Sequence, residues 1–398
     1  MLRVDPTPVA SALGAEIESA VDWLNQSALP IWLASGYDRA LGGFFERINL
    51  DGTPKRDDNR RARVQPRQVY CYAACGGETI PAAWHEAIDG GYSWFEKVYP
   101  RPDGFYGNLA SPEGALIDDG FDLYNQAFAL FAFAQIAASF PARRDAMETK
   151  ARDLLAALRS THAHPQGGFE EAVPTRLPLC SNPHMHLLEA SLAWETVAND
   201  ASPWQALADE VAGLAMRSFI DPRTGALREF FDHDWSPYPG EKGRIVEPGH
   251  QFEWAWLLLR WSVSRNHAAA RIAAVRLCEI GSAHGICPDR RVAFMGLYDD
   301  FTVSDPVARL WPQTEWLKAA VLLAATSHGA ERELYVEQAL QALRALRRFL
   351  DTDVKGLWYD KMRPDGSFVE EPAPASSFYH IVCAILEADA RMKAIESL

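Results

Sequence analysis

Apolar residues recur at helical spacing along most of the chain, with polar residues at the positions between them. The pattern is clear in FDLYNQAFALFAFAQIAASF, MHLLEASLAWETV, HQFEWAWLLLRWSV and FYHIVCAILEADARM. It predicts a mostly helical protein. The expected twelve helices lie near residues 8–35, 64–77, 81–97, 120–139, 142–163, 182–198, 202–219, 247–264, 266–283, 309–327, 329–350 and 375–395.

Turn-rich segments with a common composition separate successive helix pairs. Each places a glycine among aromatic and charged residues, as in GGFFERINLDGT, PDGFYGN, QGGFEEAV, TGALREFFDHD, FMGLYDD and KGLWYDKMRPDGS. We expect short β-hairpins or extended loops there. The glycines recur at a spacing of about sixty residues, which indicates six repeats of two helices each; they are Gly42, Gly104, Gly167, Gly225, Gly296 and Gly356.

The two ends of the chain decide how six helix pairs assemble. An open solenoid needs polar capping repeats, yet the first and last predicted helices are as apolar as the middle ones. We therefore expect the ends to pack on each other and close a ring. The prediction is an all-α (α/α)6 barrel, one catalytic domain over residues 1–398, with the loops over one end. An open α-solenoid that serves as a scaffold is the alternative.

The composition excludes several classes of partner. The 398 residues include 48% hydrophobic and 23% charged residues, and the formal net charge of -14 disfavours binding to nucleic-acid phosphates. No run of 18 apolar residues is present, and acidic residues come early in the N-terminal segment, so neither a membrane span nor a secretory leader is expected. Six cysteines without framework spacing are typical of reduced thiols in a cytoplasmic protein.

Large polar side chains stand near the start of each helix that follows an aromatic loop. From Gln126 the steps to His186, His250, Glu315 and His380 are 60, 64, 65 and 65 residues, which is the period of the loops. If these helices form a parallel inner ring, their first turns converge at one mouth of the barrel. The candidate site residues are Arg67, Tyr124, Gln126, Asn182, His186, His250, Glu253, Trp311, Glu315 and His380.

A single histidine on an apolar helix is more often a hydrogen-bonded core residue than a catalyst. Several histidines in repeat register, accompanied by Arg67 and two glutamates, favour a site because burying so many ionisable groups is costly. His184 is two residues from His186, so the two cannot share a helix face, and we interpret His184 as structural. The loop histidines His162, His164 and His233 are expected in solvent.

Other chemistries remain as alternatives. Histidines with a carboxylate also suit a metal, but neither an HExxH motif nor a paired ExxH spacing is present, so we expect no metal and no other cofactor. A glycosidase would use Glu253 and Glu315 as its carboxylate pair. The sequence contains no phosphate-binding glycine loop, GxSxG elbow or dinucleotide fingerprint.

Six motifs in this order, PRQVYCYA, YNQAFAL, NPHMHLLEA, EPGHQFEWAWLLL, LWPQTEW and SSFYH, resemble the N-acylglucosamine 2-epimerase superfamily. Its members include N-acylglucosamine 2-epimerases, cellobiose 2-epimerases, mannose isomerases and sulfoquinovose isomerases. The resemblance implies the (α/α)6 barrel and proton transfer at C2 of a reducing sugar, with His250 and His380 as the acid/base pair. It also implies that Arg67, Asn182, His186, Glu253, Trp311 and Glu315 line the sugar; we add Tyr124 and Gln126 from the same polar positions.

Histidine suits this chemistry because its pKa lies near neutrality, so it can move the C2 proton without a metal. Trp254 in PGHQFEWAWLLL looks more like the mannose isomerase branch than like the GHDIEA type of the disaccharide epimerases. We therefore expect an aldose-ketose isomerase of the mannose/fructose type, a monomer or homodimer with a small sugar as its partner. The alternatives are an N-acylglucosamine or other monosaccharide 2-epimerase, a disaccharide 2-epimerase, a glycosidase on the same barrel, and a non-enzymatic helical-repeat binding protein.

Overall fold

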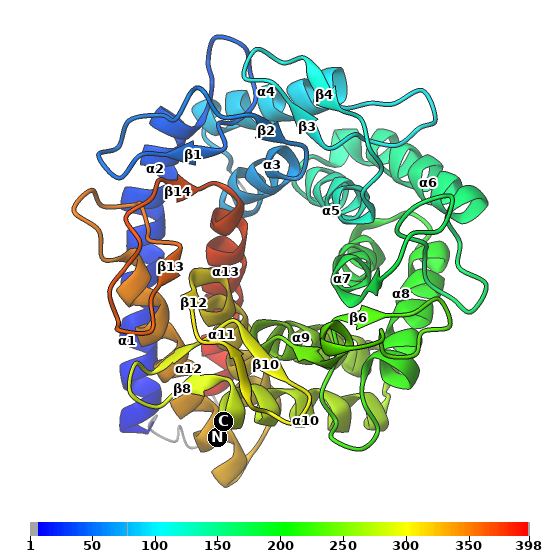
Figure 1. The fold of residues 1–398 in the computed structure, drawn as a ribbon. Helices are drawn as coiled ribbons and strands as arrows, with labels where there is room; N and C mark the ends of the chain where they lie inside the picture. The colour runs from blue at the N-terminus through cyan, green and yellow to red at the C-terminus, as the bar shows by residue number, and fades with distance from the viewer. Residues whose placement is uncertain (1–6, 78, 397–398) are drawn as a thin grey trace.

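The computed structural model describes residues 7–77 and 79–396, which form a ring of helix pairs (Figure 1). Six helices line the inside of the ring and six lie outside them. The inner helices are α3 (Val64–Cys75), α5 (Leu123–Ser139), α7 (Ser181–Val197), α9 (Pro248–Arg265), α11 (Leu310–Thr326) and α13 (Ser376–Glu396). The outer helices are α1 (Pro8–Trp23), α4 (Ala82–Val98), α6 (Arg144–Thr161), α8 (Ser202–Leu214), α10 (Ala268–His284) and α12 (Gly329–Leu350).

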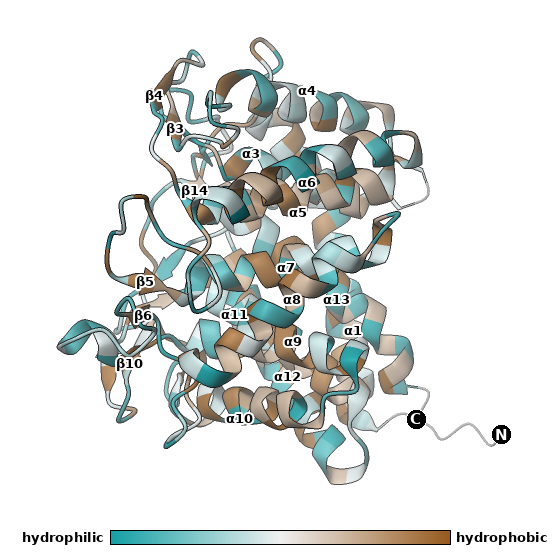
Figure 2. Ribbon diagram, turned by 90° about the vertical axis from the view of Figure 1, so that its right-hand side faces the viewer, coloured by the Kyte–Doolittle hydropathy of each residue, from teal (hydrophilic) through white to brown (hydrophobic). Residues whose placement is uncertain are grey.

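The two layers differ in how their side chains are buried. Inner helices are buried on nearly every face, and α11 buries every residue from Leu310 to Ala324. Outer helices such as α6 and α10 bury one stripe and expose the other, so apolar and polar residues alternate along them (Figure 2). A polar residue on an inner helix is therefore costly unless its polar atoms are hydrogen-bonded.

The ring closes on itself. Neighbouring inner helices pack in the order α3, α5, α7, α9, α11 and α13, and α13 also packs against α3. The outer helix α1 packs against both α12 and α13. At this seam Trp32 stacks on Trp358 with ring centroids 4.7 Å apart and donates a hydrogen bond from Nε1 to the Gly356 carbonyl. The predicted (α/α)6 barrel is confirmed, and the open solenoid is not the fold.

Short antiparallel strands lie in the loops at one end of the ring (Figure 2). Most strand pairs join the loops of neighbouring repeats, and the others form within one loop; together they make a rim around the mouth. The paired strands are β1 (Arg47–Ile48) with β14 (Ala373–Pro374), β2 (Arg60–Arg61) with β3 (Leu109–Ala110) and β4 (Leu116–Asp118), β5 (Leu179–Cys180) with β6 (Phe230–Phe231), β7 (Ile245–Val246) with β10 (Gly296–Tyr298) and β11 (Val303–Asp305), β8 (Ile286–Cys287) with β9 (Val292–Ala293), and β12 (Ala308–Arg309) with β13 (Lys361–Met362).

The first predicted helix, 8–35, is the one whose course differs most from expectation. It runs as α1, a π-helical turn Leu24–Ala28, the short α2 (Leu29–Ile31) and a second π-helical turn Trp32–Gly36. The π turns re-aim the chain where Trp32 enters the seam. Among the described residues, no helix is both long enough and apolar enough to cross a membrane.

Candidate active site

A cavity of about 370 Å³ opens at the mouth of the ring, among the first turns of the inner helices. Every inner helix contributes to it, because six parallel helices bring their N-terminal turns together there. Eight of the ten predicted site residues line it: Arg67, Tyr124, Asn182, His186, His250, Glu253, Trp311 and His380. The sequence did not identify the remaining lining residues, Arg61, Arg63, Glu247, Met295, Arg309, Ser376 and Ser377.

His250 lies among carboxylates. Its Nδ1 is 2.8 Å from Glu229 Oε2 and 3.5 Å from Glu247 Oε2. Burial lowers the pKa of His250, but the two carboxylates outweigh it and raise the pKa to about 10. Burial also raises the pKa of Glu247, to about 7, although His250 opposes that shift. His250 therefore carries a proton on both ring nitrogens near neutral pH.

His380 has the opposite surroundings. Its Nδ1 is 2.8 Å from Glu315 Oε1, which leaves Nε2 as the ring nitrogen that can act on a ligand in the cavity. Burial lowers the pKa of His380 well below its ordinary value, and the positive charges of Arg67 and Lys318 lower it further. His380 is therefore a neutral imidazole. The Trp311 ring contacts both histidines, with centroids 5.0 Å from His250 and 5.9 Å from His380.

Hydrogen-bond donors occupy another part of the lining. Arg67 donates to the Ser376 carbonyl at 3.3 Å and to the Tyr124 hydroxyl. His186 Nδ1 lies 3.1 Å from Glu189 Oε2, and burial lowers the pKa of His186 to about 4. Asn182 Oδ1 is buried without a hydrogen-bond partner among the described residues. These groups surround the cavity with one fixed cation and several neutral polar atoms.

Glu253 is a buried carboxyl group at the base of the cavity. It is 1% exposed, and its Oε1 makes no hydrogen bond within the described part of the chain. Burial raises the pKa of Glu253 well above its usual range, and the nearby Glu315 raises it further. Lys318, at 3.9 Å, opposes this shift only in part. A neutral Glu253 can donate a hydrogen bond to a ligand oxygen.

The structure places Gln126 and Glu315 outside the cavity lining, contrary to expectation. Gln126 is fully buried, and its amide accepts from the Tyr106 backbone N–H at 3.0 Å and donates to the Tyr106 carbonyl at 2.9 Å. Its polar atoms are thus used to hold a loop. Glu315 lies behind His380 and binds its Nδ1. Glu315 therefore contacts an imidazole of the site instead of the space where a sugar would lie.

Gln126 belongs to a device that recurs around the ring, which we call the glutamine clamp. Gln65, Gln251 and Gln313 exchange the same two hydrogen bonds with the loop backbones of Phe44, Leu227 and Ala293. His184 takes the equivalent place and accepts from the Phe169 N–H at 3.0 Å, as expected for a structural residue. The residues two positions after the clamp residues are Arg67, Phe128, His186, Glu253 and Glu315. Of these, Arg67, His186 and Glu253 line the cavity.

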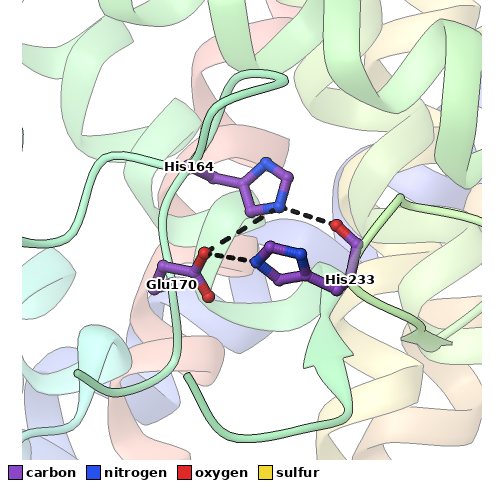
Figure 3. A group of neighbouring side chains, drawn as sticks. All are labelled: His164, Glu170 and His233. Carbon is purple, nitrogen blue, oxygen red and sulfur yellow. Dashed lines mark hydrogen bonds and ion pairs between the residues drawn. The ribbon is translucent and has the colours of Figure 1, made fainter. Parts of the chain in front are cut away.

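The expectation that the loop histidines lie in solvent is wrong for His162 and His164, which are both buried. His162 stacks on Phe121 with centroids 3.8 Å apart. His164 donates from Nε2 to the His233 carbonyl at 2.7 Å (Figure 3). Its Nδ1 accepts a hydrogen bond from Trp235 Nε1 at 3.0 Å. His233 is half-exposed and lies 2.8 Å from Glu170 (Figure 3). This cluster joins two loops and is separate from the cavity.

Each of the three histidines in the cavity lining is paired with a carboxylate behind it. In each pair the ring nitrogen that faces the carboxylate is Nδ1, at 2.8 Å for His250, 3.1 Å for His186 and 2.8 Å for His380. An Nδ1–H that donates to a carboxylate offers no lone pair, so these contacts orient the imidazoles and fix their tautomers. The chemistry that this arrangement supports is proton transfer by histidine.

Comparisons with known proteins identify the family of this chain. The sequence profile of the N-acylglucosamine 2-epimerase (GlcNAc 2-epimerase) family matches residues 43–384. A mannose-6-phosphate isomerase of Rhizobium meliloti (strain 1021) is 59% identical over 372 residues, which cover 93% of this chain and 96% of the relative. A D-mannose isomerase of Pseudomonas cannabina pv. alisalensis is 28% identical over 272 residues, or 62% of this chain and 64% of the relative.

Among solved structures, the cellobiose 2-epimerase from Spirochaeta thermophila DSM 6192 superposes with a TM-score of 0.86 at 20% identity, and covers 98% of this chain and 100% of its own. At that identity the likeness concerns the fold, and it agrees with the (α/α)6 barrel. The family match extends over most of the chain, and a relative at 59% identity has nearly the same length. The chain therefore belongs to the N-acylglucosamine 2-epimerase family and is an enzyme of the sugar isomerase and epimerase class.

Proposed function

We propose that this enzyme interconverts D-mannose and D-fructose through a cis-enediolate, with His380 as the base and His250 as the acid. The observation that carries the proposal is a pair of imidazoles on one cavity: His250 lies beside two carboxylates, which raise its pKa, and burial and two nearby cations lower the pKa of His380. Proton abstraction next to a carbonyl needs a neutral base, and the developing charge needs a proton donor. His380 supplies the neutral base and His250 supplies the proton donor. Neither histidine has to gain or lose a proton before the reaction starts.

The proposed reaction begins when His250 protonates the ring oxygen and takes up the proton of the anomeric hydroxyl, so that the pyranose opens to the aldehyde and His250 is again protonated. His380 Nε2 then takes the proton from C2. The electron pair of the C2–H bond forms the C1=C2 double bond, and the carbonyl pair moves onto O1, which gives the cis-enediolate. His380 returns the proton to C1, His250 donates its proton to O1, and the neutral His250 then takes the proton of the O2 hydroxyl, so that the carbonyl forms at C2 and the product is the ketose.

The polar lining supports the enediolate. Arg67 provides a fixed positive charge, and the first turns of six inner helices direct their N-terminal dipoles toward the same mouth. Glu253 in its acid form can donate to O1 or O2. Trp311, between the two histidines, offers a face on which the sugar can stack and excludes water from the reacting carbons.

The sugar itself is proposed from two observations. The relative at 59% identity is named a mannose-6-phosphate isomerase, which supports a ketose product and the mannose configuration. Each arginine at the cavity mouth already has a carboxylate partner: Arg61 with Glu46, Arg63 with Asp122, and Arg309 with Asp360. Because these pairs neutralise the mouth, we favour the uncharged sugar. D-Mannose 6-phosphate is the second candidate, since four arginines line the cavity.

A 2-epimerase is the runner-up reaction at the same residues. His250 would then deliver its proton to the opposite face of C2, and the product would be the epimeric aldose. The two outcomes share the enediolate and differ only in which carbon and which face receive the proton.

The test is incubation of the enzyme in heavy water with D-mannose, D-mannose 6-phosphate, D-glucose, N-acetyl-D-mannosamine and cellobiose, each followed by proton NMR. We expect D-fructose from D-mannose, with solvent deuterium at C1. Conversion of the phosphate ester at the higher kcat/KM would replace the uncharged substrate, and a C2 epimer would replace the isomerase. Absence of exchange and product in all tubes would contradict the proposed function.

A further inference from the structure

Lys318 is a buried cation on the inner helix α11, outside the cavity lining. It lies on α11 one turn after Glu315, and its side chain is 0% exposed. Its Nζ is 2.6 Å from Glu315 Oε2 and 3.9 Å from Glu253 Oε1, and it lies 4.1 Å from the centroid of the Trp256 ring. Lys318 does not line the cavity, so it cannot contact a sugar there.

The ammonium group is costly at this position. Its neighbours along α11, Leu317, Ala319, Ala320 and Val321, are apolar and buried. A buried ion pair contributes little net stability, and an apolar residue of similar size often serves as well. Packing alone therefore gives no reason for a lysine here, which points to a task that depends on its charge.

Glu315 connects this charge to the reacting group. Its two oxygens have different partners: Oε2 forms an ion pair with Lys318 Nζ at 2.6 Å, and Oε1 accepts a hydrogen bond from His380 Nδ1 at 2.8 Å. The result is a continuous line from Lys318 through Glu315 to His380 and into the cavity. We propose that Lys318 is a positioning residue that keeps Glu315 ionised. The ionised Glu315 accepts a hydrogen bond from the Nδ1–H of His380, which leaves Nε2 unprotonated as the base. This inference rests on the proposed role of His380.

The charges around His380 define what Lys318 does. Three buried carboxyl groups and two permanent cations surround the imidazole; the facing groups are Arg67 on α3, His186 and Glu189 on α7, Glu253 on α9, Glu315 and Lys318 on α11, and Tyr379 on α13. Burial raises the pKa of Glu315, and Lys318 is the group that opposes this shift most. Without Lys318, the Glu315–His380 pair would bind an additional proton. On His380 this proton would remove the neutral base, and on Glu315 it would remove the carboxylate that orients the imidazole.

The effect is predicted to appear in the pH dependence. In Lys318→Met the pKa of His380 rises, because a nearby cation is lost while the carboxylate remains. The acidic limb of the kcat/KM profile should move to higher pH by about one unit or more, which is the usual effect of one charge at this range. KM should change by less than about threefold, because Lys318 touches no ligand.

A rescue variant separates charge from packing. Lys318→Met/Glu315→Gln removes both charges and keeps an amide oxygen that can accept from Nδ1, so its acidic limb should return toward that of the unaltered enzyme. If Lys318→Met does not fold, Glu315→Gln and the double variant make the same comparison. Both lack the carboxylate, and the double variant should have its acidic limb about one unit higher.

A direct titration makes the inference independent of turnover. The imidazole C–H resonances of His380, assigned with a His380→Gln variant, are followed by NMR against pH in the full-length protein. We expect no titration of His380 between pH 6 and 8, and a titration at higher pH in Lys318→Met than in the unaltered protein. Identical His380 titrations in the two proteins, or a rate loss at all pH values that the double variant does not restore, would overturn the inference. A shifted titration in a protein that turns over no sugar would contradict the proposed function alone.

Discussion

The cavity has two walls that carry the same side chain in different surroundings. We call His250 and Glu247, with Glu229 behind them, the carboxylate wall, and His380 and Arg67, with Lys318 behind them, the cation wall. Both histidines are buried, and each holds a carboxylate at 2.8 Å from its Nδ1. Burial acts in the same direction on both, so the neighbouring charges decide that one imidazole is protonated and the other is neutral.

The comparison shows that a histidine–carboxylate contact does not by itself determine protonation. Next to the His250–Glu229 pair lies a second carboxyl group, Glu247, which adds negative charge and favours the protonated imidazole. Behind His380 the second charge is Lys318, which neutralises Glu315 and leaves that carboxylate as a hydrogen-bond acceptor. The residue one step beyond the contact therefore assigns the roles of acid and base.

The largest effect is expected from removal of either imidazole. His250→Ala and His380→Ala should each lower kcat by about 10²- to 10⁴-fold, because each removes one proton-transfer group. Initial rates measure the loss, and circular dichroism checks the fold. His233→Ala is the matched control, since His233 is a half-exposed histidine outside the cavity. An active variant at either wall would remove that histidine from the acid/base pair.

The next effect concerns the basic limb of the pH profile. Since the pKa of His250 is raised to about 10, its proton is held below that pH, and kcat/KM should fall only above it. Glu229→Gln removes the closest carboxylate, so the basic limb should move down by about 1 to 3 units. Glu247→Gln should shift it less, because Glu247 is 3.5 Å away and partly exposed. An unmoved limb in Glu229→Gln would mean that the carboxylate wall does not set the protonation of His250.

A smaller effect is expected from a change outside the two walls, in the glutamine clamp. Gln126→Ala should lower the free energy of unfolding by about 1 to 3 kcal/mol, because it leaves two buried backbone groups of Tyr106 without partners. Urea titration measures the change. Because the glutamine clamp does not line the cavity, KM should stay the same; a raised KM at unchanged stability would return Gln126 to the sugar-binding residues.

The smallest effect is expected from chelation. EDTA should leave the rate unchanged, because the proposed steps use only the histidines and polar groups of the two walls. Assays before and after dialysis against the chelator test this. If EDTA lowers the rate and an added divalent cation restores it, the enzyme uses a metal ion in addition to the histidines and carboxylates.

The architecture was predictable because it depends on periodicity. Helical spacing of apolar residues and the recurring glycine loops are local signals, and they predict the twelve helices and the closed ring that the structure contains. The cavity lining was predictable where a polar group interrupts an inner helix, as at His186 and Glu253. Position within the helix was harder. Gln126 interrupts its helix in the same way, yet it belongs to the clamp register and points to a loop.

The charges of the site could not be predicted from the sequence. Glu229 comes from a loop 21 residues before His250, and nothing in that loop marks it as a partner. Lys318 lies in an apolar helix and resembles an isolated exception. Burial of His162 and His164 likewise depends on aromatic side chains that distant loops bring to them, Phe121 and Trp235. Such contacts follow from the assembled ring and have no signal at fixed spacing.

Closure of the ring through α13, α1 and α3 has a consequence for how the chain can be connected. Because each repeat in a closed ring packs between two neighbours, the fold does not require the chain to begin at a particular repeat. If the native ends were joined by a short linker, the chain could be opened instead in an exposed loop such as the one between α7 and α8, and the same helix neighbours would remain available. The circularly permuted protein should retain the barrel, whereas deletion of α13 would expose the apolar flanks of two inner helices.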